Sequence, residues 1–293
     1  MIFRMKQVIL SCLYWLDQQV PAGIGIWLRN RCFPWHPVLD VVEFHLTDQC
    51  NMNCTGCSHY SPFAEKWLAD RESVQRDLAA LRMKFKGGIR HVNLLGGEPL
   101  LHPDLIGFLR CVKETCPETL VTIVTNGILL LKQSEEFWQA CRDVGCRINV
   151  SLYGPVAAQR ADIEAKGRRE RVPIRINVSD VFFARMVPDG SVCAKSAFRF
   201  CRRTTYCPYL REGRLYPCAQ AYHIRDFARA CKKELEADAG IDIHSSIGAV
   251  AILRYLMTPS VVCRYCKDRA RLMRWRNNSH DVSEWLFDEA APL

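Results

Sequence analysis

Short apolar runs alternate with longer amphipathic stretches from residue 41 onward. The runs are rich in Val, Ile and Leu, have the length of buried strands, and cover residues 41–46, 91–95, 120–124, 147–151 and 174–178. The stretches between them place apolar residues at helical spacing over residues 64–85, 103–116 and 135–144. Because strands and helices alternate, the pattern predicts parallel βαβ units in an α/β fold. A sixth strand cannot be assigned from the pattern.

The first 20 residues have apolar positions at helical spacing, and Pro21 ends the predicted helix. Polar residues at 17–19 interrupt the apolar run before the roughly 18 residues that a membrane span needs. Two interpretations stay open: a helix packed against the domain, or membrane-surface contact through residues 1–30. Residues 29–40, with two prolines, are predicted to be a linker.

Composition describes an ordinary globular protein apart from its cysteines. Hydrophobic residues make up 49% and charged residues 24% of the chain, but there are 16 cysteines. The N-terminus has no charged, apolar and small-residue pattern of a secretion signal, so we expect a cytoplasmic protein with few disulfides. The cysteines are then expected to be metal ligands or reduced thiols.

Positive charge is concentrated in one part of the chain. Residues 160–232 hold 16 Lys or Arg against 7 Asp or Glu, an excess equal to the net charge of +9 of the whole sequence. Three interpretations stay open. The positive charge could attract an anionic substrate or a membrane surface, it could offset the negative charge of thiolate-bound clusters, or it could be a solvated basic face. The sequence carries no nucleic-acid-binding signal.

Cys50, Cys54 and Cys57 lie within eight residues and have the spacing C-x3-C-x2-C. A disulfide would leave one sulfur over, and a closed zinc site would need His59 as fourth ligand. A 4Fe-4S cluster has four iron corners, so three thiolates would hold it and leave one iron open to another ligand.

The loop lies between the first and second predicted strands, and the second strand ends in Gly96-Gly97-Glu98-Pro99. In these two motifs, over roughly residues 40–180, the sequence resembles the radical S-adenosylmethionine (SAM) enzymes. The family usually has an aromatic residue just before the last cysteine, but this chain has Gly56, and His59 or Tyr60 is the expected substitute in the contact with adenine.

The resemblance implies a partial, TIM-like (βα) barrel, with its site at the carboxyl ends of the strands. It implies SAM as cofactor, with its amino and carboxylate groups on the open iron of a 4Fe-4S cluster, and the following binding residues: Gly96, Gly97, Glu98, Thr125, Asn126 and Ser151. Paired glycines would let backbone N–H groups approach the ligand, and Glu98 would accept from its ammonium group. An ordinary turn at Asn126-Gly127 and a plain strand end at Ser151 are the alternatives.

A second group of cysteines follows residue 190. Residues 206–218 are expected to form a hairpin that turns at Glu212-Gly213, and a C-x2-C pair comes later. The group resembles the auxiliary-cluster extensions called SPASM and Twitch domains, which implies one further 4Fe-4S cluster, held by Cys218, Cys263 and Cys266 with either Cys201 or Cys207. A structural zinc and unligated thiols are the alternatives.

The sequence therefore predicts a helical extension and linker over 1–40, a radical SAM core over 41–190, and a small cysteine-rich auxiliary-cluster domain over 191–293. The expected function is reductive cleavage of SAM to a 5′-deoxyadenosyl radical that takes a hydrogen atom from an unidentified substrate, in a net oxidation assisted by the auxiliary cluster. A small molecule or a peptide would be the substrate, and flavodoxin or ferredoxin the low-potential electron donor. A peptide-modifying maturase of the SPASM type and a non-catalytic iron-sulfur or zinc sensor are the alternatives.

Overall fold

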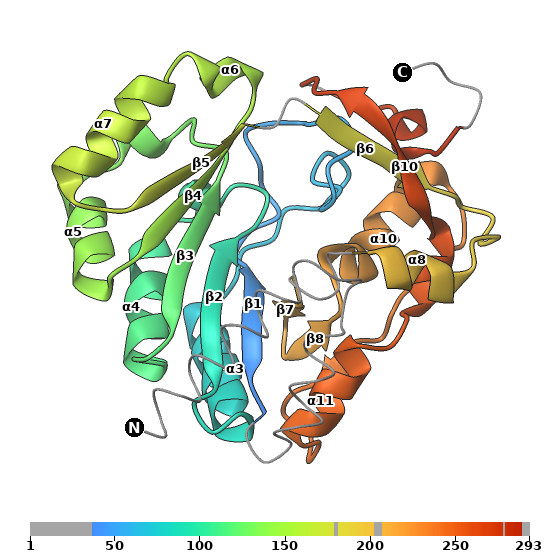
Figure 1. Ribbon diagram of the computed structural model, residues 1–293, viewed down its shortest axis with the longest axis horizontal. Helices are drawn as coiled ribbons and strands as arrows, with labels where there is room; N and C mark the ends of the chain where they lie inside the picture. The colour runs from blue at the N-terminus through green and yellow to red at the C-terminus, as the bar shows by residue number, and fades with distance from the viewer. Residues whose placement is uncertain (1–36, 179–180, 202–206, 278, 289–293) are drawn as a thin grey trace.

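The computed structural model describes residues 37–288, except 179–180, 202–206 and 278 (Figure 1). The predicted N-terminal helix, its membrane contact and most of the linker lie outside the described residues.

An eight-stranded sheet forms the centre of the fold, in the order β5-β4-β3-β2-β1-β7-β8-β9 (Figure 1). Its first five strands pair in parallel and are β1 (Leu39–His45), β2 (Ile89–Leu95), β3 (Leu120–Thr125), β4 (Arg147–Leu152) and β5 (Ile174–Val178). All five were predicted from apolar runs. The α/β class with a parallel sheet is thereby confirmed.

Helices between the strands cover one side of the sheet (Figure 1). They are α3 (Arg71–Lys84), α4 (Leu105–Thr115), α5 (Glu135–Val144), the single turn α6 (Gly154–Ala157) and α7 (Arg160–Glu170), with 3-10 turns η1 (Pro99–Leu101) and η2 (Leu130–Lys132). Helix α5 has its predicted bounds, with Ser134 accepting from the N–H of Phe137 and Gly145 left-handed at its end. Helix α3 begins later than predicted because Asp70 caps it by accepting from the N–H of Ser73. Within the described residues, no helix has the length and apolarity to cross a bilayer.

The predicted hairpin extends the same sheet. Strands β7 (Tyr209–Arg211) and β8 (Arg214–Tyr216) pair antiparallel around Glu212 and Gly213, whose φ angles are 50° and 72°. Positive φ at both central residues is what a tight two-residue hairpin turn requires. Strand β7 lies parallel to β1, and the two-residue strand β9 (Ile241–Asp242) follows β8. The sheet thus contains strands from both sides of the domain boundary predicted near residue 190, which stays a prediction.

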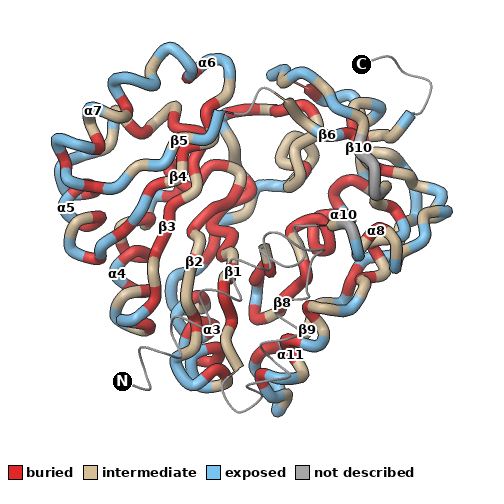
Figure 2. Tube along the Cα trace, viewed as in Figure 1, coloured by how far each residue is buried: buried red, intermediate tan, exposed pale blue. Residues whose placement is uncertain are grey.

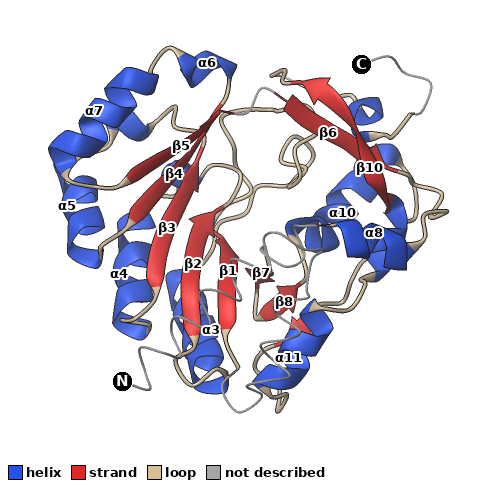
Figure 3. Cartoon of the chain, in the orientation of Figure 1, coloured by secondary structure: helices blue, strands red, loops and turns tan. Residues whose placement is uncertain are grey.

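A second, two-stranded sheet stands apart from the first (Figure 3). It pairs β6 (Val181–Met186) with β10 (Cys266–Arg274) in antiparallel fashion. Around it lie α8 (Ala194–Phe200), α10 (Ala219–Cys231), η3 (Val261–Tyr265) and η4 (Val282–Trp285). Helix α11 (Ala249–Leu256) lies apart from it, below β8, and packs in the larger hydrophobic cluster (Figure 1). Strand β6 was not predicted from the sequence. Its partner β10 lies at least 80 residues later in the chain, and local patterns cannot reveal such pairing.

The described residues contain two hydrophobic clusters. The larger one joins the parallel sheet to α3, α4 and α5. Figure 2 shows β1 to β4 as largely buried, whereas the edge strand β5 is largely exposed. The smaller one combines Tyr60 of the cysteine loop with Tyr209, Phe227 and Trp285 of the later part of the chain. The loop therefore lies between two packed layers.

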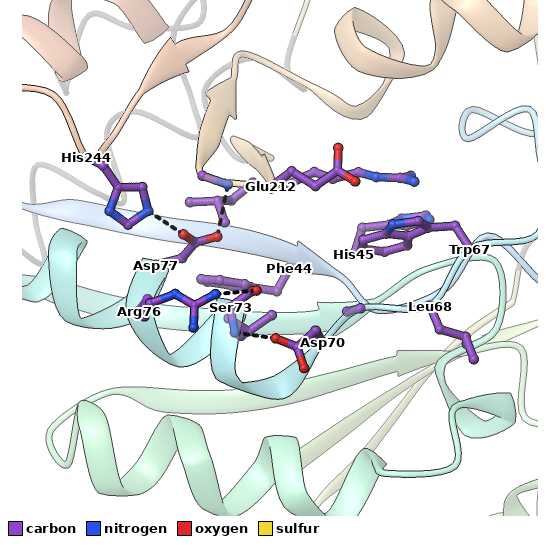
Figure 4. A pocket seen from close by; sticks show the side chains of 15 residues that line it. Phe44, His45, Trp67, Leu68, Asp70, Ser73, Arg76, Asp77, Glu212 and His244 are labelled. Carbon is purple, nitrogen blue, oxygen red and sulfur yellow. Dashed lines mark hydrogen bonds and ion pairs between the residues drawn. The ribbon is translucent and has the colours of Figure 1, made fainter.

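A pocket of about 410 Å³ lies between α3 and the β7–β8 turn (Figure 4). At one end, the buried carboxylate of Asp77 accepts from the N–H of Gly213 at 3.1 Å and pairs with the His244 ring at 2.6 Å. Asp77 thus ties the hairpin turn to helix α3.

We expect Gly213→Ala to destabilise the protein more than Gly145→Ala. Both glycines are left-handed, so each change should cost about 1 kcal/mol from backbone strain. A Cβ on Gly145 meets nothing within 4 Å, whereas one on Gly213 would lie 2.9 Å from the His244 ring and break its contact with Asp77, for about 1 kcal/mol more. Urea unfolding of the reduced proteins measures the difference, and equal losses would contradict the contribution of the Asp77–His244 contact.

Candidate functional site

One cavity of about 210 Å³ at the carboxyl ends of the strands brings most predicted site residues together. Its lining includes the three thiols of the loop and residues that follow the next three strands: Cys50, Cys54, Cys57, Gly96, Gly97, Thr125, Asn126 and Ser151. Carboxyl ends of parallel strands meet at the same edge of a sheet, which is why residues up to 101 positions apart share this cavity.

The two glycines bring one backbone directly against another. A Cβ on Gly97 would lie 2.4 Å from the carbonyl oxygen of Gln49, and one on Gly96 would lie 2.5 Å from that of Thr47. The N–H groups of Gly97 and Glu98 donate to these same carbonyls, of Thr47 at 2.7 Å and Gln49 at 2.9 Å. The observed reason for glycine is therefore close packing against the start of the cysteine loop. The N–H of Gly97 therefore cannot donate to a ligand as expected, because it already donates to the carbonyl of Thr47.

Glu98 is fully buried and connects the ends of two strands. Its carboxylate accepts from the hydroxyl of Thr125 at 2.6 Å, the N–H of Asn126 at 2.8 Å and the N–H of Leu100 at 3.0 Å. Burial raises the pKa of Glu98, and these three donors act in the opposite direction because they favour the carboxylate. Oxygen Oε2 accepts only one of the three bonds, so it retains the capacity for a further donor.

Asn126 extends this network into the cysteine loop. Its Nδ2 donates to Oδ1 of Asn51 at 2.7 Å, and its own Oδ1 accepts from the N–H of Ile128 at 3.0 Å. The segment between Cys50 and Cys54 is thereby fixed to the end of β3.

The three thiols line the same cavity. Burial raises the pKa of Cys50 to about 12 and that of Cys54 to about 11, and the charge of Cys57 acts on both in the same direction. Cys50 and Cys54 are therefore protonated at neutral pH until a metal displaces their protons. Three cysteine thiols are the donor set that holds a 4Fe-4S cluster with one iron left open, so the residues present fit that group.

The two expected substitutes for the missing aromatic residue lie in different places. His59 lines the cavity. Tyr60 is fully buried in the smaller hydrophobic cluster, where its hydroxyl contacts Met186 and Gln220, so the expectation that it contacts adenine is wrong. Sequence reasoning missed the aromatic residues that do line the cavity, Tyr153 and Phe182, because they belong to segments with no motif.

Four of the later cysteines act on one another. Burial raises the pKa of Cys218, and the thiols of Cys201, Cys263 and Cys266 raise it further by their charge. Cys263 has its pKa raised to about 12 by burial, with Cys266 and Cys201 adding to the shift. Cys201 is thus placed to act together with Cys218, Cys263 and Cys266.

His45, Asp48, Arg211 and His223 form a buried polar network next to the cysteine loop. His45 donates from Nε2 to Asp48 at 2.5 Å, and Arg211 pairs with the same carboxylate at 2.8 Å. His223 donates from Nδ1 to Asp226 at 2.9 Å and accepts from the hydroxyl of Tyr209 at 2.7 Å. His45, Asp48 and His223 have ligand atoms within 4.8 Å of one another, but Arg211 already neutralises Asp48. Hydrogen bonds and the Arg211 ion pair account for the contacts of Asp48 and His223, whereas Nδ1 of His45 is buried without a hydrogen-bond partner.

We expect the free energy of unfolding to fall on acidification through the titration of His45. Burial lowers the pKa of His45 from 6.5 to about 4, so below pH 6.5 the unfolded chain binds a proton that the folded protein excludes. Between pH 7.5 and 5 this single group should remove about 2 kcal/mol.

His45→Gln retains a donor for Asp48 and does not titrate. The variant should lack that part of the pH dependence in urea unfolding at the two pH values, and identical slopes for both proteins would contradict the buried neutral histidine.

Comparisons with known proteins concern the segment that contains the cysteine loop. Residues 44–172 match the model of the "Radical SAM superfamily". The chain is 34% identical to the GTP 3',8-cyclase of Limosilactobacillus fermentum over 116 residues, which are 39% of this chain and 33% of that protein. It is 32% identical to the GTP 3',8-cyclase of Paenarthrobacter nicotinovorans over 136 residues, 45% of this chain and 36% of that protein. The chain thus spans about a third of the length of these curated relatives.

Among solved structures, the crystal structure of BtrN in complex with AdoMet and 2-DOIA is 16% identical, with a TM-score of 0.48 over 80% of this chain and 99% of that one. Residues 44–172, with their cysteine loop and Gly-Gly-Glu turn, match the radical SAM superfamily, and the curated relatives named here are enzymes, which favours an enzyme over the sensor alternative.

Proposed function

We propose that Cys50, Cys54 and Cys57 hold a 4Fe-4S cluster beside a bound SAM molecule. The observation that carries this proposal is the single cavity that joins the three thiols to the ends of the next three strands. When bound, such a cluster supplies one electron to the sulfonium, which yields methionine and a 5′-deoxyadenosyl radical that takes a hydrogen atom from a C–H bond of the substrate.

The chain's own residues would bind and orient the nucleotide. Oε2 of Glu98 could accept a further hydrogen bond from the ammonium group of SAM, while the other contacts of the carboxylate keep Thr125 and Asn126 in place, although Glu98 is fully buried and the cavity lining consists of its neighbours. By the family resemblance, Thr125, Asn126 and Ser151 would lie near the ribose or the carboxylate. Tyr153 and Phe182, whose ring centroids are 5.4 Å apart, give the cavity an apolar wall that would exclude water.

We further propose that Cys201, Cys218, Cys263 and Cys266 hold one auxiliary 4Fe-4S cluster, in an extension of the SPASM or Twitch type. The effect of Cys201, Cys263 and Cys266 on the pKa of Cys218, and of Cys201 and Cys266 on that of Cys263, supports this set. By the family resemblance, the parallel sheet would be the partial TIM-like barrel. A zinc ion is disfavoured because these described thiols are not grouped at single-ion distances.

The substrate we propose is an anionic small molecule that undergoes net oxidation, with the auxiliary cluster as electron acceptor. The basic excess of residues 160–232 supports an anionic substrate. The similar proteins are named for GTP, but the similarity covers only about a third of their length. A peptide substrate of a SPASM-type maturase is the second candidate. Flavodoxin or ferredoxin is the proposed electron donor.

Anaerobically reconstituted protein should convert SAM to 5′-deoxyadenosine when a strong reductant is present. Cys54→Ala should reduce this conversion at least 100-fold, because two thiolates cannot hold the cluster with one iron open. Chromatographic measurement of 5′-deoxyadenosine tests the prediction, with the buried Cys111→Ala, which lies on α4 away from the cavity, as the control. Equal turnover in both variants would refute the proposed cluster ligands.

Cys201→Ser and Cys207→Ser distinguish the fourth auxiliary ligand. The wild type should contain about eight irons per chain, four in each cluster. Cys201→Ser should lower the auxiliary iron, whereas Cys207→Ser should leave the total near eight. Iron and sulfide analysis measures both, and the opposite ranking would assign the ligand to Cys207.

A further inference from the structure

The segment that follows β10 lies against the cysteine loop. Residues 276–285 form hydrogen bonds with residues 53–57. Between backbone groups, the N–H of Thr55 donates to the carbonyl of Arg276 at 3.0 Å, and the N–H of Ser279 donates to that of Asn53 at 2.9 Å. Side chains add bonds of 2.9 Å from Asn53 N to Asn277 Oδ1, from Thr55 Oγ1 to Glu284, and from Trp285 Nε1 to Cys57 O. The C-terminal part of the chain thus fixes the loop from the side opposite the sheet.

Trp275 differs from these residues because it contacts a sulfur. Its indole Nε1–H donates to Sγ of Cys54 at 3.2 Å. The ring stacks on Tyr153 with an interplanar angle of 6°, and a Cβ on Gly154 would lie 3.1 Å from it. Its backbone follows Arg274, which pairs with Val181 in the second sheet. The donor is therefore held by stacking on one side and by strand pairing on the other.

A hydrogen bond to a thiolate ligand changes the energy of the cluster that the thiolate holds. The N–H withdraws electron density from the sulfur, and the bond strengthens when the cluster gains an electron, because its negative charge increases. Such a bond stabilises the reduced form more than the oxidised form. Its loss should make the cluster harder to reduce.

We propose that Trp275 is a positioning residue that raises the reduction potential of the cluster at Cys50, Cys54 and Cys57. This inference rests on the proposed function, since it requires the cluster. Through this bond, the C-terminal segment sets how easily a low-potential donor of the flavodoxin or ferredoxin class delivers the electron for SAM cleavage. Trp275 directly follows β10, which begins at Cys266. Residues 266–275 therefore connect the proposed auxiliary site to the indole that donates to Cys54.

Trp275→Phe and Trp285→Phe form a matched pair for the test. Each removes one indole N–H and retains an aromatic ring, but Trp275 donates to a sulfur and Trp285 to the carbonyl oxygen of Cys57. In a redox titration of the reconstituted proteins, followed by electron paramagnetic resonance without SAM, Trp275→Phe should show about a tenfold lower ratio of reduced to oxidised cluster at a given potential. For one electron this equals a fall of about 59 mV. Trp285→Phe should titrate like the wild type.

A second measurement uses the wild-type protein, so it does not depend on the folding of a variant. With 15N-indole tryptophan, pulsed electron paramagnetic resonance of the reduced cluster should detect one weakly coupled nitrogen. Absence of that coupling, an unchanged titration of Trp275→Phe, or equal shifts in both variants would overturn the role of Trp275. If wild-type protein holds no cluster at Cys50, Cys54 and Cys57, the proposed function itself fails, and iron analysis shows this first.

Discussion

The hydrogen bonds of the Glu98 carboxylate are the constraint on which the site depends. The residue follows β2, accepts from Thr125 and Asn126 after β3, and donates its own N–H to Gln49 of the cysteine loop. A buried carboxylate is strongly unfavourable without such donors, and the donors in turn would be orphaned without it. Three strand ends are therefore held in one arrangement, and the positions of the cysteines follow from it.

Two different segments of the chain hold the cysteine loop in place. On the sheet side, the contacts come from within residues 44–172, the segment shared with the superfamily. On the other side, residues 275–285 supply the contacts, and they lie beyond that segment. The shared part can thus provide a common cavity, while the later part adjusts it for this chain. Gly56 illustrates the adjustment, because a Cβ there would lie 2.8 Å from the end of the Met273 side chain.

Sequence patterns predicted the features that depend on residues close together in the chain. Apolar runs gave the five parallel strands, Glu212-Gly213 gave the hairpin, and the order of strands placed the cavity residues at one edge. The patterns could not predict contacts between distant segments. Arg211 meets Asp48 from 163 residues away, and Trp275 meets Cys54 from 221 residues away. Tyr60 looked like a ligand contact from its place beside the loop, but it packs into a core whose other members lie far along the chain.

The central claim is that a 4Fe-4S cluster, held by three thiolates, keeps one iron for SAM. Electron paramagnetic resonance of the reduced, oxygen-free protein during titration with SAM tests it most directly. The account predicts the signal of a reduced 4Fe-4S cluster whose shape changes as SAM binds its open iron, and that this change is lost when Cys50, Cys54 or Cys57 is replaced. A protein without that signal, or with one that stays the same at saturating SAM, would contradict the account.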